Sequence, residues 1–446
     1  MLKQFYDKKN SFKEFFNPKN GMYIRTGILD ENGKDTNVDP FMRCFPGLID
    51  IGIMGHCVHG KSGLCAKSGI QCYQNGLKTY APNMSLENFK KIVDECKDKC
   101  FQFALGGRGD VDQHENFEEI LQYCSENGIV PNFTTSGLGM TDEIAKICKK
   151  YCGAVAISMY SRLDDVVPDL AIRKLNFEEL DKAYSSPDDV PVFFTFGNTN
   201  KNCYFDAPQY IINGKEYGWE ELHHFIFNGK PQKYEIFRIF NEKTNNSSNY
   251  TMNAVKMLLD NGVKTNIHYV LSNSTIDEAI IRLKYNGFPQ GINAVIFLLH
   301  KPVGLGQESN VLNYNDPRVK EFFALVDNNK FDFKIGFDSC TVPAIINFTS
   351  NIAENSLDSC EGGRFSMYIT SDMKALPCSF DNQDMNWAFD ISNDTIQNAW
   401  DSEQFNKFRS HFLNSCPNCP NKANCYGGCP IRRQIVLCES QNKDLK

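Results

Sequence analysis

The segment Gly55–Gly76, with the sequence GHCVHGKSGLCAKSGIQCYQNG, decides how the rest of the chain is interpreted. It carries three cysteines, Cys57, Cys65 and Cys72, separated by seven and then six residues. The preceding segment Pro46–Met54 (PGLIDIGIM) is apolar and has the length of a buried strand. Three thiolates on a glycine-rich loop after a strand can converge on one soft metal centre. Because a tetrahedral site would still lack one ligand, we expect this centre to bind a further molecule.

Composition places the chain among ordinary globular proteins. It has 446 residues, of which 41% are hydrophobic, 23% charged and 12% aromatic, which is enough for two or more domains. The net charge of −7 argues against a nucleic-acid partner. We see no apolar run of about 18 residues that would span a membrane, and no apolar signal segment at the start. Eighteen cysteines without an export signal favour thiolate chemistry in a reducing, cytoplasmic setting.

Apolar runs of strand length alternate with amphipathic helical patterns from residue 46 to about residue 300. One such helix follows Ser85, a good N-cap, and another ends at Asn127-Gly128. This alternation predicts an α/β fold whose parallel strands curve into a partial (β/α)6 barrel, with ligands at their carboxyl ends. The six predicted strands are Leu48–Ile53, Phe101–Leu105, Pro131–Thr135, Ala154–Met159, Thr265–Leu271 and Ala294–Leu299.

The chain divides into three predicted parts. Residues 1–45 form a lead-in, residues 46–335 the barrel, and residues 336–446 a smaller cysteine-rich module. About residues 163–248 interrupt the barrel, which is far longer than an ordinary connection. This insertion includes the strand-like run Val190–Phe196. It is either a substrate-binding element at the rim or an additional packing layer.

The carboxy-terminal module is defined by eight cysteines, which amount to two full sets of four ligands. A module with little regular structure can be held together by metal–thiolate bonds. Two structural zinc sites are the plain alternative, but the cysteine loop at residues 55–76 favours clusters. The eight cysteines are Cys340, Cys360, Cys378, Cys416, Cys419, Cys425, Cys429 and Cys438.

Polar groups follow the second, third and fourth predicted strands. After the second strand, FALGGRGD places Gly106, Gly107 and Asp110 where backbone carbonyls and a carboxylate can hold the ammonium group of a small zwitterion. Hydroxyl and guanidinium groups at the same edge could take a carboxylate and ribose hydroxyls. These groups belong to Ser136 in TTSG and to Ser158 and Arg162 in ISMYSR.

On these motifs the whole chain resembles a radical S-adenosylmethionine (SAM) enzyme with a C-terminal SPASM domain. The resemblance implies a [4Fe–4S] cluster on Cys57, Cys65 and Cys72 whose fourth iron binds the amino and carboxylate groups of SAM. It further implies that SAM is cleaved to methionine and a 5′-deoxyadenosyl radical, which abstracts hydrogen from a substrate.

The SPASM resemblance implies two auxiliary [4Fe–4S] clusters, which gives three clusters in total. The family pattern CX2CX5CX3C, a gap and a last cysteine matches the run from Cys416 to Cys438. Family usage then implies a first auxiliary cluster on Cys340, Cys360, Cys378 and Cys429. It implies a second on Cys416, Cys419, Cys425 and Cys438.

Five features depart from the family pattern. The first loop is CX7CX6C where the family has CX3CX2C, and Tyr73 after the third cysteine is the candidate adenine contact in place of an aromatic residue at Gln71. The family's GGE is GGRGD here, which moves the acidic role to Asp110 or leaves it to the Gly107 carbonyl. Ser136 replaces an asparagine, and Met373 replaces a glycine.

Other cysteines and histidines have plainer interpretations. Cys96, Cys100, Cys124 and Cys148 lie on apolar helix stripes, so we expect core packing for them. The two histidines of the first loop, His56 and His59, could touch the cluster or brace the loop. His268 and His300, in or after strands, could be core histidines or line a pocket.

The resemblance extends to peptide maturases that act on ribosomally made precursors. We therefore expect a peptide-modifying oxidoreductase that forms thioether or similar crosslinks in a cysteine-rich precursor peptide, reduced by a flavodoxin or ferredoxin. The aspartate that sulfatase-maturing relatives carry after the cysteine matching Cys378 is Ser379 here, which leaves Asp381 as a catalytic candidate. Alternatives are a SPASM enzyme acting on another protein or a non-peptide substrate, and a metal-stabilised binding protein without turnover.

Overall fold

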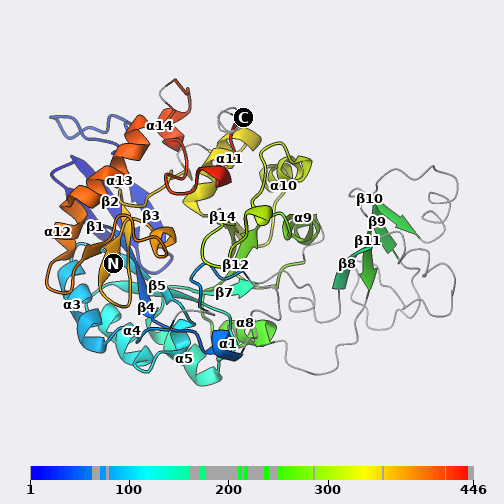
Figure 1. Cartoon of the computed structure of the whole chain (residues 1–446), viewed down its shortest axis with the longest axis horizontal. Helices are drawn as coiled ribbons and strands as arrows, with labels where there is room; N and C mark the ends of the chain where they lie inside the picture. The colour runs from blue at the N-terminus through cyan, green and yellow to red at the C-terminus, as the bar shows by residue number, and fades with distance from the viewer. Residues whose placement is uncertain are drawn as a thin grey trace.

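A ten-stranded sheet forms the centre of the computed structural model (Figure 1). The structure describes residues 2–62, 71–76, 80–159, 171–175, 209–212, 215–218, 236–240, 250–284, 287–353, 356–416 and 418–439. The strand order is β14-β13-β12-β7-β6-β5-β4-β15-β16-β17. The bounds are β4 Leu48–Met54, β5 Gln102–Gly107, β6 Val130–Thr135, β7 Val155–Met159, β12 Thr265–Leu271, β13 Ala294–Leu299, β14 Lys334–Phe337, β15 Ser366–Ile369, β16 Lys374–Leu376 and β17 Phe389–Asp390.

The six predicted strands are confirmed as the consecutive parallel strands β4, β5, β6, β7, β12 and β13. The sheet is longer than predicted, because β14 pairs in parallel with β13 and β15 pairs in parallel with β4. Thus β14 lies across the predicted boundary at residue 335, and β15 of the cysteine-rich module continues the barrel sheet.

Amphipathic helices cover the outside of the sheet (Figure 1). Ser85 caps α3 by accepting a hydrogen bond from the Asn88 amide, as predicted, and Thr141 caps α5 in the same way through Ile144. The four helix-stripe cysteines Cys96, Cys100, Cys124 and Cys148 are buried in the core, which confirms their packing role. The helices are α3 Leu86–Cys96, α4 Phe117–Glu126, α5 Asp142–Tyr151, α8 Tyr250–Asp260, α9 Ile276–Lys284 and α10 Pro317–Asn328.

Side chains on alternate strand positions face the inside of the barrel. On β4, Ile49, Ile51 and Ile53 are fully buried in the outer core, so the period of two turns Asp50 towards the lumen. Parallel pairing sets Asp50 beside Ala104 of β5 and Tyr368 of β15. An ionisable group therefore lies on the inner face of an otherwise apolar strand.

The lead-in folds as a three-stranded antiparallel sheet of β1 Lys3–Asp7, β2 Phe12–Asn17 and β3 Met22–Arg25. The predicted Asn20-Gly21 turn is present, with φ of +78° at Gly21. Buried Glu14 accepts hydrogen bonds of 2.7 Å from both Tyr23 of β3 and Arg43. Arg43 in turn donates to the Lys99 carbonyl at 2.7 Å, shortly before β5, and so joins the sheet to the barrel.

The insertion contributes its own four-stranded antiparallel sheet, ordered β10-β9-β11-β8. Its strands are β8 Ala171–Leu175, β9 Gln209–Ile212, β10 Lys215–Gly218 and β11 Ile236–Phe240. The strand-like run Val190–Phe196 lies outside the described residues.

The cysteine-rich module combines short strands with α11 Val342–Phe348, α12 Ile396–Asp401, α13 Glu403–Asn414 and α14 Lys422–Cys425. Met373, which replaces a family glycine, lies in the turn between β15 and β16 with φ of +63°. Its side chain is buried, so apolar packing offsets a left-handed backbone that glycine would adopt without strain. Among the described residues, no helix is long and apolar enough to cross a membrane.

Candidate metal and cofactor site

The cysteine loop begins where β4 ends, at the carboxyl edge of the barrel. Cys57 precedes the short helix α1 Val58–Ser62, and its Sγ accepts the Gly60 amide at 3.3 Å. Burial raises the pKa of the Cys57 thiol, and the charges of Asp110 and Cys72 raise it further. Cys57 and Cys72 are therefore neighbours, while Cys65 lies outside the described residues.

Glycines allow this loop to lie directly on the segment after β5. A Cβ at Gly76 would lie 2.7 Å from the Arg108 carbonyl oxygen and 3.1 Å from the Cys57 Cβ. Gly107 has φ of +121°, and a Cβ there would clash with the Met54 backbone. Met54 also receives the Arg108 amide at 2.8 Å. The GGRGD segment and the cysteine loop thus form one closely packed edge, as their strand positions predict.

Asp110 connects three of the elements at this edge. Its carboxylate accepts the Ser136 amide at 2.9 Å and the Ser136 hydroxyl at 2.5 Å. His59 places Nε2 3.1 Å from the same carboxylate, and His56 places Nδ1 3.2 Å from the Ala81 carbonyl oxygen. Both histidines brace the loop. The structure therefore brings Asp110 and Ser136 together, and a Cβ at Gly106 would meet nothing within 4 Å.

Other candidate side chains line the barrel interior. Ser158 on β7 is in register with His268 on β12, whose Nδ1 lies 3.2 Å from the Thr134 hydroxyl. Burial lowers the pKa of His268 to about 4, so this imidazole is neutral near pH 7. A cavity of about 370 Å³ is lined by Thr134, His268 and Asn132 among others. Arg162 lies outside the described residues.

Tyr73 turns towards the cysteine-rich module. Its ring centroid is 5.0 Å from that of Phe380, which follows Cys378 by two residues. The backbone of the same turn is held by the segment after β13, because the Leu305 amide donates to the Cys72 carbonyl at 3.0 Å. Gln74 accepts a hydrogen bond of 2.6 Å from Asn382. The cysteine loop is thus fixed from two sides.

One set of four cysteines surrounds a small cavity near the carboxyl end of the chain. Cys416, Cys419, Cys425 and Cys438 line it together. Burial raises the pKa of Cys425 to about 11, and the charges of the other three cysteines raise it further. The cavity leaves out Cys429, although Cys429 is closer in sequence to Cys425 than Cys438 is.

Cys429 belongs instead with the upstream cysteines. A side-chain hydrogen bond to Cys429 raises the pKa of Cys340, and burial raises it further. Burial raises the pKa of Cys360 to about 12, with Cys340 adding to the shift. Burial also raises the pKa of Cys378, reinforced by the charges of Cys360 and Cys340. The cavity and these interactions between thiols group the cysteines in the same way as the family resemblance does.

Both sets suit an iron–sulfur cluster, because each offers four cysteine thiols, and four cysteine thiolates are the usual ligands of such clusters. In the described residues, no group of three or more His, Cys, Asp or Glu side chains is close enough together to hold a single metal ion. The set of Cys416, Cys419, Cys425 and Cys438 is therefore defined by its shared cavity, and the set that includes Cys340 by the mutual interactions of its thiols.

Asp381, the catalytic candidate, is fully buried and serves the fold locally. Its carboxylate accepts the Trp387 amide at 3.0 Å and the Asn386 amide at 3.2 Å. These hydrogen bonds hold the loop after Cys378 in place. The Asp381 carboxylate therefore points at the backbone of that loop.

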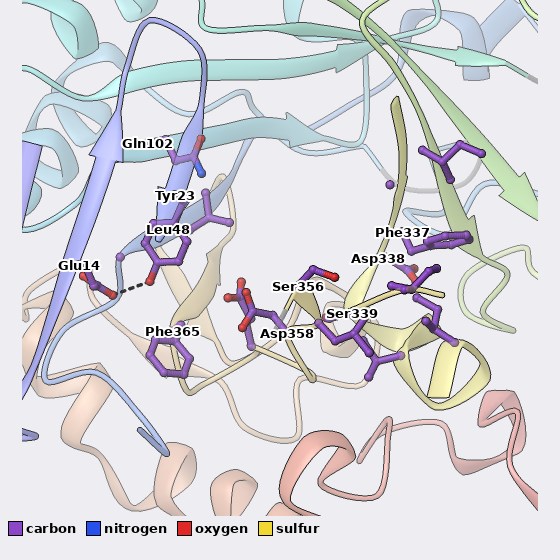
Figure 2. A pocket seen from close by; sticks show the side chains of 18 of the residues that line it. Glu14, Tyr23, Leu48, Gln102, Phe337, Asp338, Ser339, Ser356, Asp358 and Phe365 are labelled. Atoms are coloured by element: carbon purple, nitrogen blue, oxygen red, sulfur yellow. Dashed lines mark hydrogen bonds between the residues drawn. The ribbon is translucent and has the colours of Figure 1, made fainter. Parts of the chain in front are cut away.

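A separate cavity of about 690 Å³ opens at the seam between β14 and β4 (Figure 2). Leu48, Phe337 and Phe365 lie around it, and Glu14 and Tyr23 form its hydrogen-bonded wall (Figure 2). Burial raises the pKa of Glu361, which also lines it, to about 7. The lead-in sheet, barrel and cysteine-rich module all contribute to this cavity.

Sequence reasoning missed Asp50 and Lys301. Asp50 could have been found as the one charged residue within the strand LIDIGIM. Lys301 could have been found because it follows β13 at the carboxyl edge of the barrel, where ligands bind.

Comparison with known proteins finds a family match within the cysteine-rich module and structural matches over most of the chain. Residues 360–425 match the SPASM family of iron–sulfur cluster-binding domains. SuiB of Streptococcus suis bound to S-adenosylmethionine has 14% sequence identity and a TM-score of 0.55, over 90% of this chain and 78% of that chain. SuiB bound to precursor peptide SuiA has 12% identity and a TM-score of 0.57, over 98% and 100% of the two chains. None of the curated proteins matches this chain.

These comparisons establish the fold and the domain content. The chain has the SuiB-type α/β fold, in which a parallel-strand sheet precedes a SPASM domain. The SPASM region belongs to a family of iron–sulfur cluster-binding domains. The α/β fold with a parallel-strand sheet and the carboxy-terminal SPASM domain that the sequence predicts are thereby confirmed.

Proposed function

We propose that the protein is a radical SAM oxidoreductase that modifies a ribosomally made precursor peptide, forming thioether or similar crosslinks from cysteine. In this proposal Cys57, Cys65 and Cys72 hold the SAM-binding [4Fe–4S] cluster, and the two sets of four cysteines hold auxiliary clusters. When bound, the first cluster supplies the electron that cleaves SAM to methionine and a 5′-deoxyadenosyl radical.

The observation that carries the proposal is the meeting of two independent features at one edge of the barrel. The cysteine loop packs on GGRGD at the carboxyl ends of β4 and β5. Phe380, next to Cys378 of the first auxiliary set, contacts Tyr73 of the same loop. A cofactor at the loop would therefore react in a space enclosed by both the barrel and the SPASM domain.

The chain's own residues would bind and orient SAM. Gly106 and the Gly107 carbonyl offer an open backbone edge for its ammonium group. Asp110 positions the Ser136 hydroxyl, and Ser158 lies deeper in the lumen beside the neutral His268. In this proposal these hydroxyls bind the carboxylate and ribose of SAM, with Arg162 and Tyr73 as further candidate contacts.

A peptide substrate is supported by the fold likeness to SuiB, which has been solved with precursor peptide SuiA. The cavity at the seam of β14 and β4 is lined by residues of both the barrel and the SPASM domain. A flavodoxin or ferredoxin is the proposed reductant, since such small proteins deliver single electrons to clusters.

The test is co-expression with a short cysteine-rich peptide encoded beside the gene, followed by mass spectrometry. A thioether removes two hydrogens, so the peptide should lose about 2 mass units for each crosslink. The variant Cys72→Ala should leave the peptide unmodified. If an adjacent peptide stayed unmodified with the chain fully loaded with iron, the peptide substrate would be wrong, whereas 5′-deoxyadenosine formation would still support SAM chemistry.

A further inference from the structure

Lys301 is a buried cation that the proposed function does not use. It follows β13, and only 6% of its surface is exposed. Its ammonium group forms an ion pair with Asp338, just after β14. Asp338 is itself fixed, because it accepts the Leu299 amide at 3.1 Å and the Thr341 hydroxyl at 2.7 Å. A lysine is buried only where nearby groups compensate the loss of hydration.

The groups around Lys301 belong to the segments that carry the first auxiliary set of cysteines. Asp338, its ion-pair partner, lies two residues before Cys340. Phe380, whose ring lies beneath its ammonium group, lies two residues after Cys378. The ammonium group is therefore held between the two segments that carry Cys340 and Cys378.

Lys301 also lies beside the contact between the two cysteine-bearing regions. Its Nζ is 4.6 Å from the centroid of the Phe380 ring, on the ring that packs against Tyr73. Within the same segment, Leu305 holds the Cys72 carbonyl. One short stretch after β13 thus contacts both the first loop and the first auxiliary set.

The second set of cysteines has a cation of a different kind. Lys422 lines its cavity, but its ammonium group donates to the Leu413 carbonyl at 2.7 Å in an exposed position. Water screens an exposed charge much more strongly than a buried one. The two sets therefore differ in the electrostatic environment that the chain gives them.

We propose that Lys301 is a positioning residue that raises the reduction potential of the iron–sulfur cluster on Cys340, Cys360, Cys378 and Cys429. This inference rests on the clusters of the proposed function. Reduction adds one negative charge to a cluster, and a fixed positive charge in a low-dielectric site stabilises that added charge. The first auxiliary cluster therefore accepts an electron more readily than it would without Lys301.

The test is a redox titration followed by electron paramagnetic resonance, with no SAM or peptide present. The background is Cys57→Ala/Cys65→Ala/Cys72→Ala, so only the auxiliary clusters contribute. Lys301→Met should lower the reduced-to-oxidised ratio of one cluster at least tenfold at a fixed potential, a shift of about 59 mV. Lys301→Arg keeps the charge and should restore the ratio, and the control Lys422→Met should change it little.

Asp338→Asn supplies an independent variant, because it removes a negative charge near the same cluster and should shift the potential the opposite way. The inference is overturned if Lys301→Met binds its iron but leaves both potentials unchanged. It is equally overturned if Asp338→Asn lowers the potential. A chain with no iron in either set would remove the proposed function itself, so the two failures are distinguishable.

Discussion

At the scale of single residues, Asp50 is the clearest departure from a simple apolar barrel. Burial alone raises its pKa from 3.8 to about 7. The ionisable groups that interact with it across the lumen are Tyr73 of the cysteine loop and Tyr368 of β15. Neither tyrosine is ionised near neutral pH, so neither compensates a negative charge on Asp50.

This carboxyl makes stability depend on pH. Between about pH 4 and pH 7 the folded chain keeps a proton that the unfolded chain has released, so the free energy of unfolding falls as pH rises through this window. The free energy of unfolding falls by about 1.4 kcal/mol for each unit by which the pKa of Asp50 in the folded chain exceeds its pKa in the unfolded chain. Asp50→Asn should remove this slope, so the variant should gain stability relative to the wild type between pH 5 and pH 8.

Urea denaturation of both proteins at pH 5 and pH 8 measures this difference. At each pH, the unfolding free energy of the variant is subtracted from that of the wild type. This difference cancels the contributions of the other titrating groups, which both proteins share. A wild type whose stability relative to Asp50→Asn does not change with pH would contradict the raised pKa.

At the scale of elements, the end of β5 sets the geometry of the proposed cofactor site. Gly107→Ala should destabilise the chain by about 1–3 kcal/mol, because φ of +121° strains an alanine and its Cβ meets Met54. Gly106→Ala is the matched variant, since its Cβ enters open space. It should keep the wild-type stability but bind SAM more weakly, because that space is the proposed site of the SAM ammonium group.

Thermal unfolding and equilibrium dialysis with SAM separate these two effects. Full SAM affinity in Gly106→Ala would place the ammonium group elsewhere. Wild-type stability in Gly107→Ala would show that the backbone at this position relaxes without cost.

The burial and pairing of individual strands explain which elements could be predicted from sequence. The inner strands such as β5 and β12 are apolar on the face that the helices cover, so their runs are long and clear. In contrast, β14 (KIGF) has one exposed and three partly buried residues, and β15 joins the sheet only by pairing with β4, which is distant in sequence. Neither strand carries a local pattern that would distinguish it from a loop.

At the scale of the whole molecule, the cysteines could be counted from sequence but not sorted by spacing. The spacing of Cys425 and Cys429 favours neither set, and only the family resemblance implied the interleaved pairing. The structure shows the physical reason: the chain turns through Gly427 and Gly428, both with positive φ, after Cys425. This turn carries Cys429 to Cys340, while Cys438 returns to the cavity of Cys416.

The central claim is that the loop of Cys57 and Cys72 is a SAM-cleaving centre separate from the two SPASM sets. The direct measurement is 5′-deoxyadenosine formed from SAM by the anaerobically purified, dithionite-reduced chain, alongside its iron content. The account predicts about twelve irons and 5′-deoxyadenosine for the wild type, from three four-iron clusters. It predicts about eight irons and no 5′-deoxyadenosine for Cys57→Ala/Cys65→Ala/Cys72→Ala. Cleavage of SAM that persists in this variant would contradict the account.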